Sequence, residues 1–231
     1  MSLPAPRRLV VLRHGQTAFN AEGRVQGQLD VPLDALGLAQ AAVAGAALRG
    51  LVGHIVSSDL ARAICTAELV AAGTGIVARA DPRLRELDLG EWQGHTTAEI
   101  AQRWPAQYLV WRQGEDLARG GGETYREAGA RALACLTEAL AGVEPGGTIL
   151  AVTHGGTARA ALGELLSLPT ESWWSLAPLG NTCWSVLVEG ERGWRLERHN
   201  VGPGPAVGPV PGAHDLGARP TGRGRAAQPV K

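Results

Sequence analysis

Fully apolar segments of strand length, which alternate with helical patterns, constrain the fold of this chain more than any other feature. Such segments lie at residues 9–12, 55–56, 76–78 and 149–152. Strands without a polar face belong to sheets that are covered on both sides, and such sheets are mostly parallel. We therefore expect an α/β fold with a mostly parallel central sheet and helices on both faces.

Patterns of helical length fill the chain between these strands. Thr96 and Glu99 have the spacing of a capping box, which predicts the start of a short additional helix. Residues 182–188 and 194–199 have the pattern of a β-hairpin, which we expect at the edge of the sheet. The longer helices are expected at residues 34–49, 60–72 and 123–141.

The last part of the chain has a different composition. Gly and Pro account for 13 of the 31 residues from Val201 onward, and no apolar periodicity remains there. Such a segment buries too little apolar surface to offset the entropy that is lost on ordering. We expect one domain at residues 1–200 and a disordered tail at residues 201–231.

Charge and composition exclude several kinds of function. The chain has 22 basic and 22 acidic residues, whereas proteins that bind nucleic acid usually have a basic excess, so we expect no nucleic-acid partner. Lys231 is the only lysine, and Schiff-base and P-loop mechanisms need an internal one. Arginine must therefore supply any anion binding.

The sequence predicts a cytoplasmic protein without a membrane partner. No run of about 18 apolar residues occurs, and the apolar run at 9–12 is too short for a signal peptide. Cys65, Cys135 and Cys183 are too few and too widely spaced for a disulfide framework or a Cys-x-x-Cys site. We expect them to be buried as small apolar side chains.

Three of the predicted strands lead into residues that can bind phosphate. The first leads into Arg13 and His14, the second leads to Arg62, and the fourth leads to His154. Ligands of open α/β sheets bind beyond the carboxyl ends of the strands. Each residue alone has an ordinary structural explanation, but together they predict one phosphate site. Because the histidines lack metal-ligand spacing and the arginines would repel a cation, we expect neither a metal nor a cofactor.

These motifs resemble those of the histidine phosphatase superfamily, which has the phosphoglycerate-mutase-like fold. The likeness covers most of residues 8–160 in order, and it is greatest to actinobacterial phosphatases of the glucosyl-3-phosphoglycerate phosphatase type. The segments that carry it are LRHGQTAFN at 12–20, GRVQG at 23–27, DVPL at 30–33, SSDLARA at 57–63, LREL at 84–87, GEWQG at 90–94 and THGG at 153–156.

The resemblance implies a role for each candidate catalytic residue. His14 would attack phosphorus. His154 would be the second catalytic histidine and, once protonated by its proximity to the phosphate, would add a further donor to it. Arg13 and Arg62 would bind the phosphoryl oxygens, because guanidinium groups suit them in geometry and charge. Glu86 would protonate the leaving group and later activate water. From the local sequence alone, an ion pair of Glu86 with a neighbouring arginine, Arg83 or Arg85, is an open alternative.

The resemblance also implies further contacts to the substrate. The amides of Asn20 and Gln26 would bond phosphate oxygens, although turn formation beside Gly23 and Gly27 explains them nearly as well. The predicted substrate-binding set is Arg13, Gly15, Thr17, Asn20, Gln26, Gly27, Arg62 and Gly155.

Tryptophan supplies seven of the ten aromatic residues. We expect most of them in the core, since tryptophan is usually largely buried. Trp92, Trp104 and Trp111 fall in a stretch that forms a small helical cap in the family, where they are alternative candidates for the wall of a sugar-shaped pocket. Trp173 and Trp174 are candidates for a homodimer surface.

The sequence thus predicts a phosphomonoester hydrolase that works through a phosphohistidine. Its expected partner is a small phosphorylated metabolite, with glucosyl-3-phosphoglycerate as the specific candidate and a broad range of small phosphomonoesters as the alternative. The alternatives are a cofactor-dependent phosphoglycerate mutase and a non-catalytic protein that binds a phospho-ligand. The segment after Glu86 lacks the mutase insertion, and Gly156 stands where mutases have asparagine. A non-catalytic member is expected to have lost the nucleophile or an arginine, and both are present here.

Overall fold

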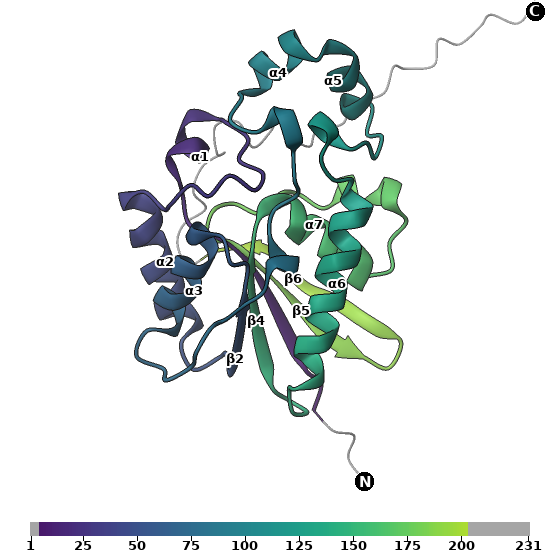
Figure 1. Ribbon diagram of the computed structural model, residues 1–231. Helices are drawn as coiled ribbons and strands as arrows, with labels where there is room; N and C mark the ends of the chain where they lie inside the picture. The colour runs from purple at the N-terminus through teal and green to yellow at the C-terminus, as the bar shows by residue number, and fades with distance from the viewer. Residues whose placement is uncertain (1–4, 203–231) are drawn as a thin grey trace, which may run out of the picture.

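A six-stranded sheet forms the centre of the protein (Figure 1), whose computed structural model describes residues 5–202. The strands lie in the order β3-β2-β4-β1-β5-β6. The four strands β3, β2, β4 and β1 are parallel to one another, whereas β5 is antiparallel to both of its neighbours, β1 and β6. The expected mostly parallel sheet is thus confirmed. The strands are β1 Arg8–Arg13, β2 His54–Ser57, β3 Arg79–Ala80, β4 Thr148–Thr153, β5 Trp184–Gly190 and β6 Gly193–Val201.

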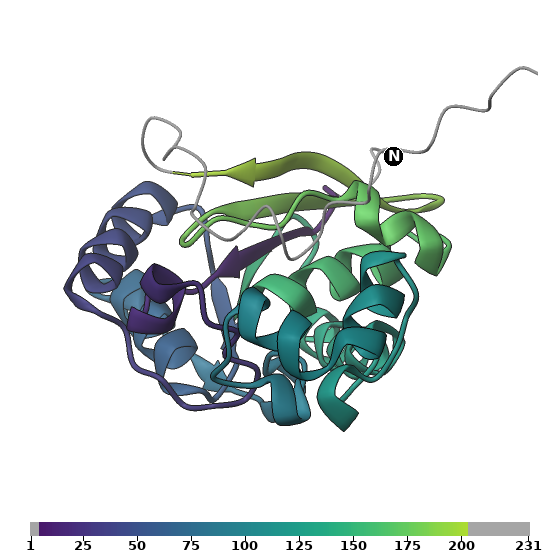
Figure 2. The same ribbon diagram turned by 90° about the horizontal axis from the view of Figure 1, so that it is seen from above.

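Helices cover both faces of the sheet, as the apolar strands predicted. α2 and α3 lie on one side, and α6 and α7 lie on the other (Figure 2). The three longer predicted helices are confirmed to within about two residues at each end. The three are α2 Ala35–Leu48, α3 Ala61–Ala71 and α6 Tyr125–Ala141, and the fourth covering helix, α7 Gly155–Leu165, was not among those predicted.

The first strand shows why its whole apolar run is buried. Successive side chains of a strand point to opposite faces of the sheet. Leu9 and Val11 pack in the core cluster that contains residues of α6 and α7. Val10 and Leu12 pack in a second cluster with residues of α3. All four side chains are at most 5% exposed, so β1 is anchored from both sides at the centre of the sheet.

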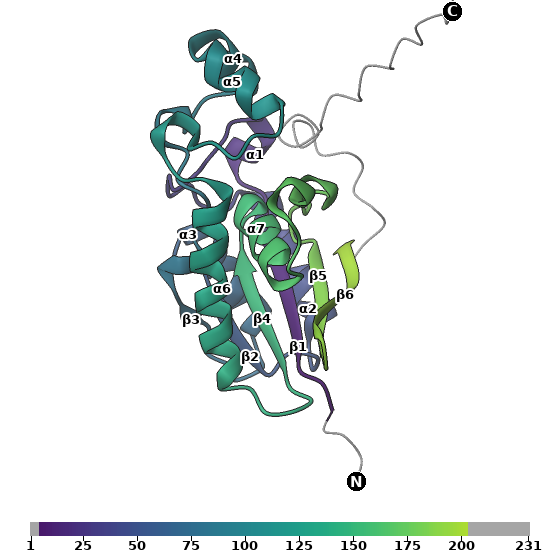
Figure 3. The ribbon, with the colours of Figure 1, turned by 90° about the vertical axis from the view of Figure 1, so that its right-hand side faces the viewer.

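A small helical cap lies above the carboxyl ends of the parallel strands (Figures 1 and 3). Its helices are α4, Thr97–Arg103, and α5, Pro105–Arg112. The predicted capping box opens α4: the Glu99 amide donates to the Thr96 hydroxyl, and the Thr96 amide donates to the Glu99 carboxylate at 2.7 Å. The remaining elements are α1 Ala18–Glu22 and the 3-10 turns η1 Pro82–Leu84, η2 Gly90–Trp92, η3 Arg119–Gly121 and η4 Thr170–Ser175.

One predicted strand is wrong in position. Residues 76–78 have no regular structure, and the edge strand β3 is confined to Arg79–Ala80. Ile76 and Ala78 pack against the core, whereas Val77 is 86% exposed. The apolar triplet is therefore partly buried chain that leads to the edge of the sheet, and pairing with β2 begins only after it, at Arg79 and Ala80.

The predicted hairpin is present and extends the sheet on the side of β1. β5 pairs with both β1 and β6, and β6 is the edge strand. β6 continues to Val201, one residue past the boundary predicted for the domain. The tail predicted from there on lies outside the described residues from 203 onward, so its disorder stays a prediction.

The tryptophans mainly build the core, as expected. Trp92, Trp111 and Trp173 are at most 4% exposed, and the rings of Trp92 and Trp111 meet edge to face at 5.8 Å between centroids. Trp173 is thus buried within its own chain and is not available to mark a dimer surface. Trp174 is half-buried and donates from Nε1 to the Gly114 carbonyl at 3.2 Å.

The three cysteines are free, as expected. Cys135 is fully buried, whereas Cys65 and Cys183 are half-buried. Within residues 5–202, no helix combines the length and apolarity that a bilayer crossing requires.

Candidate active site

The carboxyl ends of two adjacent strands bring both candidate histidines together. His14 follows β1 and His154 follows β4, and these strands pair directly. The centroids of the two rings are 5.1 Å apart. Arg62, in the first turn of α3, donates from Nε to Nδ1 of His154 at 3.2 Å. The convergence that the strand ends predicted is present in the structure.

Two glycines fix the loop that carries His14. A Cβ on Gly15 would overlap the backbone of Gly37, which lies in the first turn of α2. Only a pair of residues without side chains allows this approach. The Gly15 amide donates to the Thr66 hydroxyl at 3.1 Å, so this predicted phosphate contact is used within the protein.

The Gly15 carbonyl also determines which nitrogen of His14 can react. Nδ1 of His14 lies 2.7 Å from this oxygen. Because a carbonyl only accepts, Nδ1 carries the proton, and Nε2 of the neutral ring holds the free lone pair. Nε2 is therefore the atom that can attack phosphorus.

Both histidines are held in the neutral form. Burial lowers the pKa of His14 well below its ordinary value of 6.5, and the charges of Arg62 and Arg13 lower it further. Burial, followed by the charge of Arg62, lowers the pKa of His154 in the same direction. The nucleophile is thus unprotonated at neutral pH without help from a base.

These two buried histidines make the folded state sensitive to mild acid. Unfolded histidine takes up a proton near pH 6.5, whereas the folded side chains do not, so stability is complete above that pH and falls below it. Between about pH 7 and about pH 5.5 we expect a loss of about 2 to 3 kcal/mol in the free energy of unfolding. Urea denaturation at the two pH values measures this loss. It should roughly halve in His154→Gln, and an unchanged loss would contradict neutral burial of that ring.

Arg13 and Arg62 are fixed by carbonyl groups, and both retain donors for a ligand. Arg13 donates from Nη1 to Leu179 O at 2.7 Å, while its buried Nε has no partner among the described residues. Arg62 donates to the carbonyls of Leu29 and Gly27, each at 2.7 Å. Burial lowers the pKa of Arg62 to about 10, so it stays charged at neutral pH. Rigid guanidinium groups of this kind suit a phosphoryl group.

His154 uses both ring nitrogens within the protein. Arg62 only donates, so Nδ1 of His154 accepts, and Nε2 carries the proton that Ser58 Oγ receives at 2.8 Å. The sequence interpretation had a protonated His154 as a phosphate donor. In this arrangement the ring instead orients Arg62, and donation to phosphate would require an added proton and release of the Arg62 contact.

Glu86 points into the site and not toward its neighbouring arginines. Its Oε2 accepts from the Gly156 amide at 3.0 Å, and its Oε1 accepts from the Thr157 amide at 2.9 Å and from the Leu87 amide at 3.0 Å. The carboxylate thereby caps the amino end of α7, beside Gly155 and His154. Oε1 thus accepts from two backbone amides, whereas Oε2 accepts from one. Oε2 is therefore the oxygen with room for a hydrogen bond to a ligand.

The alternative ion pair of Glu86 is absent, because both neighbouring arginines have other partners. Arg85 lies 2.6 Å from Asp59, and Arg83 lies 2.7 Å from Asp81 and 2.8 Å from Glu138.

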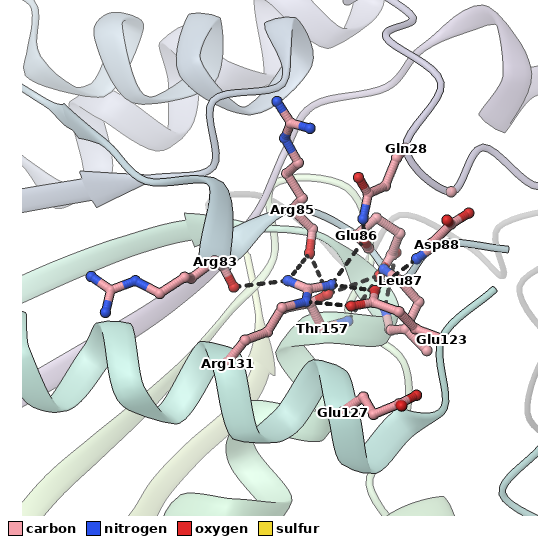
Figure 4. A network of polar contacts seen from close by, with 12 residues as sticks. Gln28, Arg83, Arg85, Glu86, Leu87, Asp88, Glu123, Glu127, Arg131 and Thr157 are labelled. Atoms are coloured by element: carbon pink, nitrogen blue, oxygen red, sulfur yellow. Dashed lines mark hydrogen bonds and ion pairs between the residues drawn. The ribbon is translucent and has the colours of Figure 1, made fainter. Parts of the chain in front are cut away.

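A clamp of charged residues holds the backbone on either side of Glu86 (Figure 4). Arg131 donates to the carbonyls of Arg83 and Arg85 at 2.8 Å and to that of Glu86 at 3.1 Å. It also pairs with Glu123 at 2.8 Å, whose carboxylate receives the amide of Asp88 at 2.9 Å. Glu86 does not directly follow a strand, so this network of side chains, and not the end of a strand, holds it in position.

Glycine at position 156 leaves room for the Glu86 carboxylate as it is placed here. A Cβ at this position would lie 2.8 Å from Glu86 Oε1 and 2.8 Å from Leu87 Cδ1. An asparagine here, as in mutases, would require the carboxylate to move. The difference between glycine here and asparagine in mutases therefore bears on where the Glu86 carboxylate can lie.

Other predicted contacts divide into those at the pocket and those that support it. Thr17 is fully buried and caps α1 through a reciprocal capping box with Asn20. Asn20 lines the pocket, and its Oδ1 accepts from Thr17 and from Asn181, which leaves the Nδ2 amide for a ligand. Gln26 also lines the pocket, and its buried Oε1 has no hydrogen-bond partner in the described part of the chain. The remaining predicted residues at the pocket are Gly27 and Gly155.

Sequence reasoning missed several residues of the site. Arg119, Tyr125 and Arg159 line the pocket, although no strand end or quoted motif marked them. Asn181 donates to the carbonyl of His14 at 3.0 Å and thus braces the nucleophile loop. The cap tryptophans do not line the pocket, so the sugar-wall alternative has no support, and the aromatic walls are Phe19 and Tyr125.

Among residues 5–202, no three His, Cys, Asp or Glu side chains converge as metal ligands. The donors that face the pocket are guanidinium groups, amides and the amino end of a helix, which bind anions. Together with a neutral buried histidine, they define an α/β enzyme site for phosphoryl chemistry.

Comparison with known proteins agrees with this class. The model of the histidine phosphatase superfamily, branch 1, matches residues 9–202. Glucosyl-3-phosphoglycerate phosphatase from Mycobacterium tuberculosis is 42% identical over 191 residues, which are 78% of this chain and 85% of that relative. The protein of the same name from Mycolicibacterium vanbaalenii is 38% identical over 215 residues, 84% and 95% of the two chains. The structure of a mycobacterial glucosyl-3-phosphoglycerate phosphatase with VO3 has a TM-score of 0.80 at 42% identity and covers 84% of this chain and 99% of that one.

The chain therefore belongs to the histidine phosphatase superfamily. It is a phosphoric monoester hydrolase that acts on a small phosphorylated metabolite.

Proposed function

We propose that the protein hydrolyses glucosyl-3-phosphoglycerate through a phosphohistidine on His14. The observation that carries the mechanism is the neutral, buried His14, whose Nδ1 is held by the Gly15 carbonyl at 2.7 Å. The substrate is suggested by the names of the relatives with 42% and 38% identity.

In the first half-reaction, Nε2 of His14 attacks phosphorus and the ester P–O bond breaks. Arg13 and Arg62 bind the phosphoryl oxygens, whose charge spreads in the transition state. The Nδ1–H bond to the Gly15 carbonyl stabilises the cationic phosphoimidazole. Glu86 Oε2, in its protonated form, gives a proton to the departing alcohol oxygen.

In the second half-reaction, water attacks the phosphorus of the phosphohistidine. Glu86, now ionised, accepts the proton of this water. The P–N bond breaks, its electron pair returns to Nε2 of His14, and inorganic phosphate leaves. Glu86 is protonated again, so the cycle closes without a cofactor.

A phosphate-release screen over phosphorylated metabolites tests this proposal. It includes glucosyl-3-phosphoglycerate, 3-phosphoglycerate, sugar phosphates and nucleotides. We expect glucosyl-3-phosphoglycerate to have the highest kcat/KM. Phosphoglycerate isomers in place of inorganic phosphate would favour a mutase, and no release across pH 5 to 8, even from p-nitrophenyl phosphate, would favour a binding protein.

The proposal also includes a cytoplasmic location, on the sequence grounds given above. A homodimer is part of it as well, although Trp173 is buried within the chain and so does not support such an interface.

A further inference from the structure

The pocket that contains His14 has more positive charge than a phosphoryl group requires. Within residues 5–202, five arginines line it. Arg24 is neutralised by Glu22 at 3.0 Å and by Glu99 at 3.1 Å. No ion pair within the described chain joins the others to a carboxylate; they are Arg13, Arg62, Arg119 and Arg159.

The phosphoryl group accounts for only half of these unpaired charges. Arg13 and Arg62 lie beside His14 at the strand ends and match a phosphate dianion. Among the residues that the structure describes, Glu86 is the only acidic one that lines the pocket. Arg119 and Arg159 therefore keep an unmatched positive charge with the phosphoryl group in place. A buried charge without a partner is costly, so these two call for a second anionic group.

Aromatic rings hold both of these arginines in place. Arg119 is 6% exposed, and its guanidinium carbon lies 4.6 Å from the centroid of the Tyr125 ring. Arg159 is 5% exposed and lies 5.0 Å from the Trp174 ring, which meets Tyr125 edge to face at 5.4 Å. Arg159 donates to the Leu176 carbonyl at 3.1 Å, which occupies one of its five N–H groups. Stacking fixes the guanidinium planes and leaves their edges free to donate.

The spacing along α7 fits a short phosphorylated carboxylic acid. Gly155 and Arg159 both line the pocket and are four residues apart, which places them on one helix face about 5 to 6 Å apart along it. In 3-phosphoglycerate, four bonds separate phosphorus from the carboxyl carbon, a span of roughly 5 Å. Arg159 is thus one helical turn farther from the phosphoryl site, where that carboxylate would lie.

We propose that Arg119 and Arg159 form a second anion site that binds the carboxylate of the substrate's glycerate group. This inference rests on the proposed phosphatase function and adds the basis of its selectivity. The site makes the enzyme prefer phosphomonoesters that carry a carboxylate about three carbons from phosphorus over neutral sugar or polyol phosphates.

A matched pair of substrates tests the site directly. 3-Phosphoglycerate and glycerol 3-phosphate share a three-carbon skeleton and an alkyl leaving group, and they differ in the carboxylate. We expect the wild-type kcat/KM to be at least about tenfold higher for 3-phosphoglycerate, mainly through KM. Hydrolysis of both at equal kcat/KM would overturn the second anion site while leaving the phosphatase function intact. Hydrolysis of no phosphomonoester would overturn the function itself.

Variants of Arg119 and Arg159 then test whether these two residues bind the carboxylate. Arg119→Gln and Arg159→Gln should each lower the preference for 3-phosphoglycerate by about tenfold, whereas Arg119→Lys and Arg159→Lys, which keep the charge, should retain part of it. Arg126→Gln is the matched control, because Arg126 follows Tyr125 on α6 but does not line the pocket. Thermal denaturation checks the fold of each variant. A preference that survives both Gln variants, or that falls equally in Arg126→Gln, would contradict the assignment.

Discussion

His14→Ala should lower kcat for any phosphomonoester by about 10⁴-fold or more, because it removes the imidazole that takes the phosphoryl group. His154 does not replace it, since both of its nitrogens are bound to Arg62 and Ser58. Inorganic phosphate should still bind with an affinity within about threefold of wild type, since Arg13 and Arg62 are anchored by backbone carbonyls and not by His14. Steady-state kinetics and competition or calorimetric titration with phosphate measure the two effects.

Rapid acid-free quenching with a ³²P-labelled substrate adds a chemical readout. Wild-type protein should carry label that is stable to alkali and labile to acid, as a phosphohistidine is, and His14→Ala should carry none. His54→Ala is the control, because His54 is exposed at the start of β2, at the opposite end of the strand from the site. Label that persists on His14→Ala, or loss of activity in His54→Ala, would exclude His14 as the sole nucleophile.

The parts of the fold that follow from local physics were predictable from the sequence. The apolar run of β1 required cover on both faces, and the structure supplies it from α3 on one side and from α6 and α7 on the other. The capping box at Thr96 places the start of α4 to the residue. The edge strand β3 was misplaced because residues 76–78 have the composition of a strand, whereas Val77 is 86% exposed and its two neighbours are only partly buried. Edge pairing depends on where the neighbouring strand ends, and residue types do not encode that.

The residues of the candidate site also fall into those that the sequence predicted and those that it did not. Residues at strand ends were found, because parallel topology brings those ends together. Arg119 and Arg159 were missed, since each lies on a helical element with no motif, and only tertiary packing against Tyr125 and Trp174 turns them into the pocket. Arg131 was missed for a related reason: its signal is a set of bonds to backbone carbonyls, which leaves no pattern in the sequence.

Replacement of Glu86 by glutamine should have effects that depend on the leaving group. An alkyl alcohol needs a proton to leave, so we expect kcat for an alkyl phosphate to fall by about 10² to 10⁴-fold. p-Nitrophenolate leaves without a proton near neutral pH, so transfer to His14 should stay fast with that substrate. Hydrolysis of the phosphohistidine also needs Glu86 to accept a proton from water, and this step should become rate-limiting.

The variant should therefore release a burst of p-nitrophenolate equal to the enzyme concentration, followed by slow turnover, and phosphohistidine should accumulate. Stopped-flow absorbance with ³²P trapping measures both, and the alkyl phosphate should give no burst. Glu91→Gln is the control, because Glu91 lies in η2, accepts a hydrogen bond from Trp104 of the cap and does not line the pocket. Equal losses for both substrates without a burst would mean that Glu86 only supports α7. That outcome is physically possible, because the amide of Gly156 donates to Oε2 at 3.0 Å and would oppose an NH2 group there. The burst separates the two roles, since a helix cap has no influence on which step of the reaction is slow.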